Sequence, residues 1–93
     1  MVGVALVAAV WYDAGMIIEN LARLTDWAAA QAAASGALDG LSRPQASAAV
    51  EALAGTVWRH AIGQGLRPGD DWGWVLEMYG PDRVAEIVAA ATE

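Results

Sequence analysis

The chain has 93 residues and a formal net charge of −6, with 11 Asp and Glu against five Arg and no Lys. So few basic residues exclude a protein that binds duplex nucleic acid, because such a protein needs a positively charged face. The lack of Cys excludes a disulfide framework, a zinc thiolate site and a thiol nucleophile, and 57% hydrophobic residues exclude intrinsic disorder. We therefore predict one small acidic domain that spans residues 1–93.

The chain begins with an almost unbroken apolar run over residues 2–12. A secretory signal requires basic residues ahead of such a run, and none is present. The run is also shorter than the roughly 20 residues that a membrane-spanning helix needs. We therefore predict a buried helix here, no interaction with a membrane and a cytoplasmic location.

From Val4 to about Leu24 the apolar residues recur at steps of three and four, which predicts one amphipathic helix. If this helix runs straight on, Trp27 falls on its polar side and is exposed. Otherwise the helix breaks near Thr25 and Asp26, and one of them caps a new helix. The Ala-rich stretch over residues 28–34 favours helix in both cases. The predicted buried stripe contains Val7, Val10, Trp11, Ala14, Ile17, Ile18, Leu21 and Leu24.

The next helix is expected to begin at Arg43, after a glycine-containing loop over residues 36–42. Ser42 is a suitable N-cap, and Pro44 falls in the first turn, where its missing N–H does no harm. The sequence Gly-Gln-Gly at residues 63–65 ends this helix. Its predicted buried face contains Ala46, Val50, Leu53, Ala54, Val57, Trp58 and Ala61.

Two short helices are expected to complete the chain. Asp70 or Asp71 is predicted to cap a helix over residues 72–79, where a carboxylate also suits the helix dipole. Pro81 begins the last helix, whose predicted inner face contains Val84, Ile87, Val88 and Ala91. Because no segment alternates with a period of two, we predict an all-α fold, a small single-domain bundle of four to five helices.

The candidates for catalysis or metal binding are few. His60 is the only His, so any triad or metal site must include it, and it lies at the edge of a buried helix face. Asp70 and Asp71 resemble a carboxylate pair, but no further acidic residue has calcium-loop spacing, which favours helix capping. No Ser occupies a nucleophile-elbow motif. We predict no catalytic residue, no cofactor and no metal, and a small enzyme relying on His60 remains an alternative.

The remaining feature is a surplus of large apolar side chains. A chain of this length leaves part of its apolar surface uncovered, and large exposed patches mark interfaces. The predicted helix over residues 72–79 is too short to bury all its aromatic residues, so Trp74 is expected to be exposed. Trp and Tyr are favoured interface anchors. The candidate interface residues are Trp72, Trp74, Met78, Tyr79 and Trp27.

These features predict a non-enzymatic protein–protein interaction module. Its acidic rim is suited to a protein partner with a basic surface, and self-association into a homo-oligomer, such as a dimer, is also predicted. The 22 Ala residues, together with the lack of Lys and Phe, are typical of a high-GC genome. This suggests a small bacterial or phage-encoded modulator, an inhibitor or adaptor of a host protein. The alternative is a structural subunit of a larger assembly, such as a phage particle component.

Overall fold

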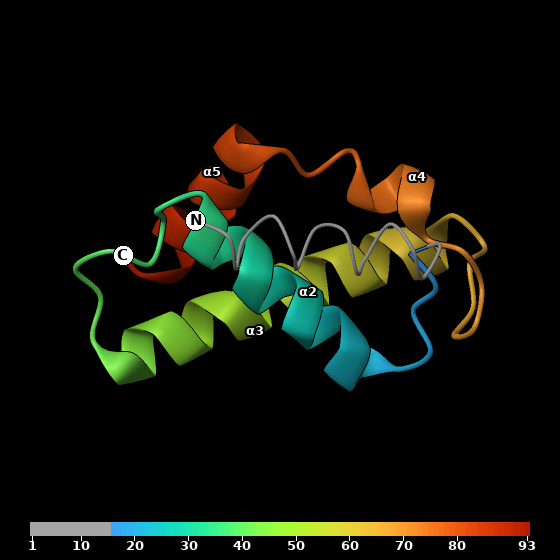
Figure 1. Cartoon of the computed structure of the whole chain (residues 1–93), viewed down its shortest axis with the longest axis horizontal. Coiled ribbons are helices and arrows are strands. Elements are labelled where there is room, and N and C mark those ends of the chain that lie inside the picture. The colour runs from blue at the N-terminus through green and yellow to red at the C-terminus, as the bar shows by residue number, and fades with distance from the viewer. Residues whose placement is uncertain (1–15) are drawn as a thin grey trace.

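The structure is a computed structural model, and it describes residues 16–93. This part of the chain contains no strand and four helices: α2 (Leu21–Ala34), α3 (Arg43–Gly63), α4 (Gly73–Leu76) and α5 (Pro81–Ala91) (Figure 1). The predicted all-α class is thus confirmed for the described residues. Among them, no helix has the length and apolar character needed to cross a membrane.

The chain between Met16 and Asn20 is not helical, which corrects the first predicted helix. The part of that prediction before Met16 lies outside the described residues. The Gly69 N–H donates to the Ile18 carbonyl at 2.7 Å, and the Trp72 N–H donates to the Met16 carbonyl at 3.0 Å. Ile18 is fully buried in this arrangement. The hydrogen bonds to a distant segment therefore replace the helical ones that the apolar spacing predicted.

Helix α2 begins after Asn20, whose side chain accepts a hydrogen bond from the Arg23 N–H at 2.9 Å. It runs without interruption to Ala34, so the break considered near residues 25 and 26 is absent. Trp27 is only 2% exposed, which corrects the expectation that it faces solvent. Because α2 begins at Leu21, its buried face starts with Leu24 and includes Trp27, whereas Leu21 itself is half exposed.

Helix α3 agrees with the prediction at both ends. The Ser42 hydroxyl accepts from the Gln45 N–H at 3.3 Å, and the Gln45 side chain accepts from the Ser42 N–H at 2.9 Å. This capping box satisfies two N–H groups that have no partner within the helix. Pro44 lies in the first turn and Gly63 is the last helical residue. The buried residues are Ala49, Val50, Leu53, Ala54, Val57 and Ala61, while Ala46 and Trp58 are half-buried.

Helix α5 begins at Pro81, as predicted, with Gly80 as its N-cap and Asp82 in its first turn. Val84 and Val88, four residues apart, form its buried face. Two other residues of the predicted inner face differ, because Ile87 is half-buried and Ala91 is exposed.

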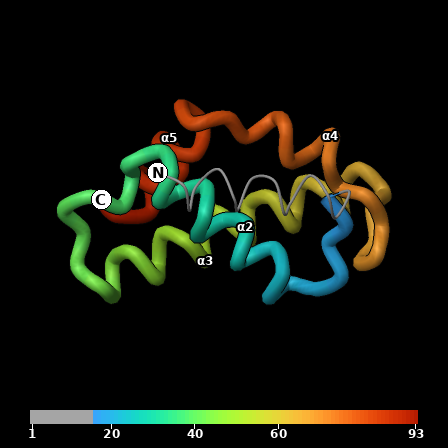
Figure 2. Tube along the Cα trace, viewed as in Figure 1, coloured from blue at the N-terminus to red at the C-terminus, as the bar shows by residue number. Residues whose placement is uncertain are grey.

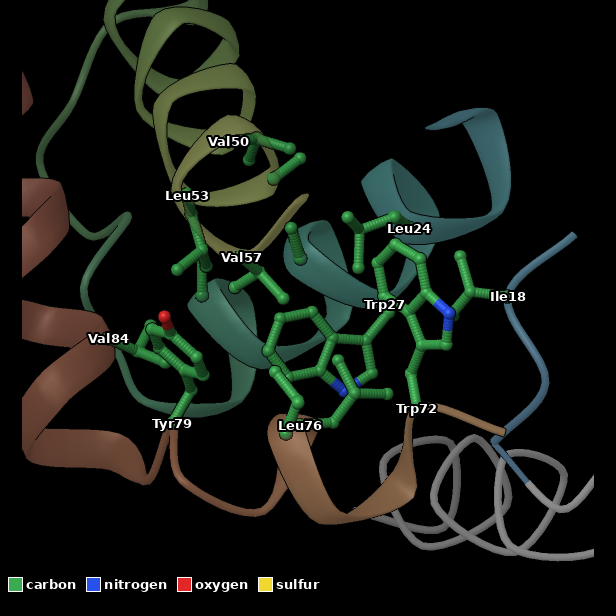
Figure 3. Packing of buried hydrophobic residues seen from close by; sticks show 14 of the residues in the cluster. Ile18, Leu24, Trp27, Val50, Leu53, Val57, Trp72, Leu76, Tyr79 and Val84 are labelled. Atoms are coloured by element: carbon green, nitrogen blue, oxygen red, sulfur yellow. The ribbon is translucent and has the colours of Figure 1, made fainter. Parts of the chain in front are cut away.

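Helix α3 is central to the arrangement, since it contacts α2, α4 and α5, and α2 also contacts α5. Figure 2 shows α4 near the C-terminal end of α3. The side chains of Trp27, Val57 and Trp72 gather between these helices (Figure 3). Small buried residues on α2 and α3, among them Ala28 and Ala54, let the two backbones approach closely. This core holds α4 in a fixed position on the molecule.

Candidate functional site

The candidate site is the helical segment that contains α4, residues 72–79. The Glu77 N–H donates to the Gly73 carbonyl at 3.0 Å, which is the bond of an α-helical turn. The Met78 and Tyr79 N–H groups then donate to the carbonyls three residues earlier, at 3.0 and 3.1 Å. The α-helix is thus shorter than the predicted 72–79: it spans only Gly73–Leu76, and the residues after it form tighter turns.

One face of this segment is part of the core. Trp72, Val75, Leu76 and Tyr79 are all buried. Trp72 and Tyr79 were candidate interface residues, as was the buried Trp27, and none of the three is available to a partner in this fold. Of the five candidates, only Trp74 and Met78 are exposed. The predicted exposure of Trp74 agrees with the structure.

Trp72 connects the start of the segment to the rest of the molecule through a hydrogen bond and a ring contact. Its indole N–H donates to the Arg67 carbonyl at 3.0 Å. Its ring lies against that of Trp58 on α3, with 5.3 Å between the ring centroids. A fully buried Trp whose N–H has a partner combines a large apolar area with a satisfied polar group. The position of α4 is therefore set by α3 and by the turn before it.

Tyr79 contacts the rest of the molecule at the other end of the segment. Its hydroxyl lies 2.8 Å from His60 Nδ1, and its ring packs edge-on against Trp27, with 6.4 Å between centroids. Burial raises the pKa of Tyr79 above its usual 10.0, although the positive charge of Arg83 lowers it in part. The phenol therefore keeps its proton at neutral pH, and its hydroxyl forms a hydrogen bond with His60 Nδ1. His60 thus has a structural partner, as its position at the edge of a buried face suggested.

The opposite face of the segment exposes Trp74 and Met78, at 50% and 57%. Trp74 lies within α4, and Met78 lies in the tighter turn that follows it. Glu77, three residues after Trp74, is exposed on the same side. We call these three residues the outer face of α4. It presents two large apolar side chains beside a carboxylate, on a segment fixed at both ends.

The surroundings of the outer face are acidic. Residues 70–82 include Asp70, Asp71, Glu77 and Asp82 but no basic residue. None of these four carboxylates forms an ion pair with another described residue; the nearest ion pair joins Arg83 to Glu86 at 3.0 Å. Arg67 and Arg83 flank this stretch in the sequence, but neither forms an ion pair with these four carboxylates.

Two of these carboxylates also shape the backbone before α4. Asp71 Oδ1 accepts from the Gly73 N–H, the first of the helix, at 2.9 Å, and Asp70 Oδ2 accepts from the Arg67 N–H at 2.8 Å. The predicted cap is corrected, because the N-cap of α4 is Trp72 and makes no side-chain cap hydrogen bond; Asp71 instead accepts from the backbone two residues later. A Cβ on Gly73 would lie 3.1 Å from Asp71 Oδ1 and 3.4 Å from the Met16 Cβ. A side chain at this position would therefore require Asp71 and Met16 to shift by a few tenths of an ångström.

Sequence reasoning missed other exposed apolar residues. Ile17 and Leu21, which were assigned to a buried stripe, are 39% and 50% exposed, and Ile62 at the end of α3 is 42% exposed. Ile17 lies next to the acidic surroundings of α4, because it forms an isolated bridge with Asp71. No local sequence pattern predicts that these residues are exposed, because their exposure depends on which residues the long-range contacts cover.

Within residues 16–93, no three His, Asp or Glu side chains are grouped closely enough to hold a metal ion. The hydroxyls of Ser35 and Ser42 form hydrogen bonds at helix ends. Comparisons of the chain with protein-family models, with curated proteins and with solved structures find no match.

Proposed function

We propose that this chain is a non-enzymatic protein-interaction module and that the outer face of α4 is its contact surface. The observation that carries the proposal is the pair of half-exposed apolar side chains, Trp74 and Met78, on a segment whose other face is buried. Such side chains gain free energy when a partner covers them.

The size of this gain is sufficient for an anchor. A Trp side chain has an area of about 150–250 Å², so the exposed half of Trp74 is about 100 Å². At about 25 cal/mol per Å², covering it contributes about 2.5 kcal/mol. Interface residues with effects of 2 kcal/mol or more are few and are enriched in Trp.

The fixed position of the segment also favours binding. Trp72 and Tyr79 hold its ends through hydrogen bonds to Arg67 and to His60. A surface that is already ordered loses little conformational entropy when a partner binds. The partner of His60 also supports a non-enzymatic role, because its Nδ1 is engaged by a buried hydroxyl of the core.

The proposal is tested by affinity capture from the native cytoplasm with four baits: the wild type, Trp74→Ala, Met78→Ala and Leu21→Ala. Leu21 is the matched control, since it is a half-exposed apolar residue on a different helix. We expect a protein that is retained by the wild type and by Leu21→Ala and lost with both outer-face variants. Equal retention by all four baits contradicts the proposal. Circular dichroism of each bait confirms that it is folded.

A further inference from the structure

The outer face of α4 combines an exposed indole with a nearby carboxylate. Trp74 and Glu77 are three residues apart within one helical turn, which brings side chains to about 5–6 Å between Cβ atoms. Asp71 lies at the start of the same turn, where one of its oxygens accepts from the Gly73 N–H. The Trp74 residue is half exposed, and no described residue forms an ion pair with either carboxylate.

These groups match the chemistry of a guanidinium. A cation over the face of Trp is attracted by the negative charge of the ring face. An Arg side chain is planar, so it stacks on the ring while its N–H groups remain free to donate to a carboxylate at the edge. Of the described exposed apolar residues, only Trp74 has such a ring.

We propose that Trp74 and Glu77, with Asp71 beside them, bind an Arg side chain of a protein partner whose contact segment is basic. This inference rests on the proposed function, because it specifies the partner of the same surface. The apolar side chain of Met78 contacts the apolar residues that flank this Arg in the partner segment.

The charges around the site select this partner over a second copy of the chain. In a symmetric dimer the same surface meets itself, so the carboxylates of residues 70–82 in one copy face those of the other. Like charges in contact disfavour association by several kcal/mol, whereas a basic segment gains from the same carboxylates. Homodimers through the outer face of α4 are therefore disfavoured, although self-association through another surface is compatible with the site.

The experiment uses two synthetic peptide probes of about 18 residues, or about five helical turns. The first has Leu on one helix face and Arg on the other, and the second has citrulline in place of every Arg. Citrulline keeps the planar shape but lacks the charge. Isothermal titration calorimetry of the full chain with each peptide gives the ratio of the two affinities, which measures the contribution of the guanidinium.

We expect the wild type to bind the Arg peptide at least about tenfold more tightly than the citrulline peptide. Glu77→Gln lowers the Arg affinity about two- to fivefold, the range for an exposed ion pair. Trp74→Leu keeps an apolar side chain and loses the ring face, so it lowers the Arg-to-citrulline ratio about threefold. Glu51→Gln, which removes the same charge from the exposed face of α3, leaves the ratio unchanged. Because exposed charges are screened, added salt reduces the Arg affinity and not the citrulline affinity.

Each of the following results overturns the inference. If the wild type binds both peptides with equal affinity, the site does not recognise the guanidinium. An effect of Glu51→Gln as large as that of Glu77→Gln shows attraction by net charge alone. A dimer that Trp74→Ala dissociates, measured by light scattering, shows that the surface binds a second copy. If the ratio is one but Trp74→Ala abolishes binding of both peptides, this inference fails and the proposed function stands; if Trp74→Ala changes neither affinity, both fail.

Discussion

Trp72 and Trp74 are separated by one glycine, yet the fold gives them opposite environments. We expect Trp72→Ala to destabilise the protein much more than Trp74→Ala. Trp72 is fully buried, so its side chain removes about 200 Å² from water, which at about 25 cal/mol per Å² corresponds to about 5 kcal/mol. A compact unfolded state reduces this figure by roughly 10–40%. The expected loss for Trp72→Ala is therefore about 3–5 kcal/mol, as for other buried Trp residues.

The corresponding loss for Trp74→Ala is about 2 kcal/mol or less. Half of its surface is already in water, and water fills the space that the ring leaves, so no cavity forms. A chain of 93 residues has a free energy of unfolding of about 5–14 kcal/mol. Both variants should therefore fold, although Trp72→Ala approaches the limit.

Urea unfolding followed by far-UV circular dichroism measures both free energies, with equal m values as the check for an unchanged unfolding transition. Trp72→Phe gives a second, milder measurement, because it keeps an apolar ring and removes the indole N–H that donates to Arg67. It should lose about 1–2 kcal/mol. Equal losses for Trp72→Ala and Trp74→Ala, or a larger loss for Trp74→Ala, would refute the assignment of the two faces of α4.

Three further predictions concern the helix ends and the buried phenol. Ser42→Ala removes half of the capping box of α3 and should cost about 1 kcal/mol in thermal or urea unfolding, while Ser47→Ala on the same helix should be neutral; equal effects contradict the cap. Gly40→Ala should destabilise by about 1 kcal/mol because φ is +78° there, whereas Gly63→Ala, also in open space, should stabilise slightly; the reverse order contradicts the conformational argument. The raised pKa of Tyr79 means that the folded state holds the phenol proton more tightly than the unfolded state, so stability present below pH 10.0 is lost as pH rises through the folded pKa. Urea unfolding from pH 8 to 11 measures this loss, and Tyr79→Phe should abolish it. The variant also lacks the hydrogen bond to His60, which costs about 1 kcal/mol. A pH dependence equal to that of the wild type contradicts the prediction.

The exposure of Trp74 was predicted from the sequence because the argument needed only a local pattern, whereas three of the other four candidate residues are buried. A helical segment of two turns places Trp72, Val75, Leu76 and Tyr79 on one side and leaves Trp74 for the other. The acidic surroundings of residues 70–82 are likewise a property of the sequence. How firmly the segment is held was not predictable, because its partners Trp58 and His60 are distant along the chain.

Local chemistry also determined several helix ends. Ser42 with Pro44, Gly63 and Pro81 mark ends at which the structure agrees with the sequence. Each of these signals acts within one turn: a hydroxyl accepts from a free N–H, or a proline ring fixes φ. Such interactions do not depend on the rest of the molecule, so the sequence alone determines them.

The tertiary structure decided the segment from Met16 to Asn20 and the environment of Trp27. Periodicity favoured one continuous helix there, with Trp27 on its polar side. Hydrogen bonds between this segment and residues 69–72 compete with that helix, and they place Ile18 in the core without a helical turn. Because the helix begins only at Leu21, its buried face differs from that of the predicted helix and includes Trp27. Apolar spacing predicts that a residue is buried. Only the contacts between distant segments decide its backbone conformation and the residues against which it packs.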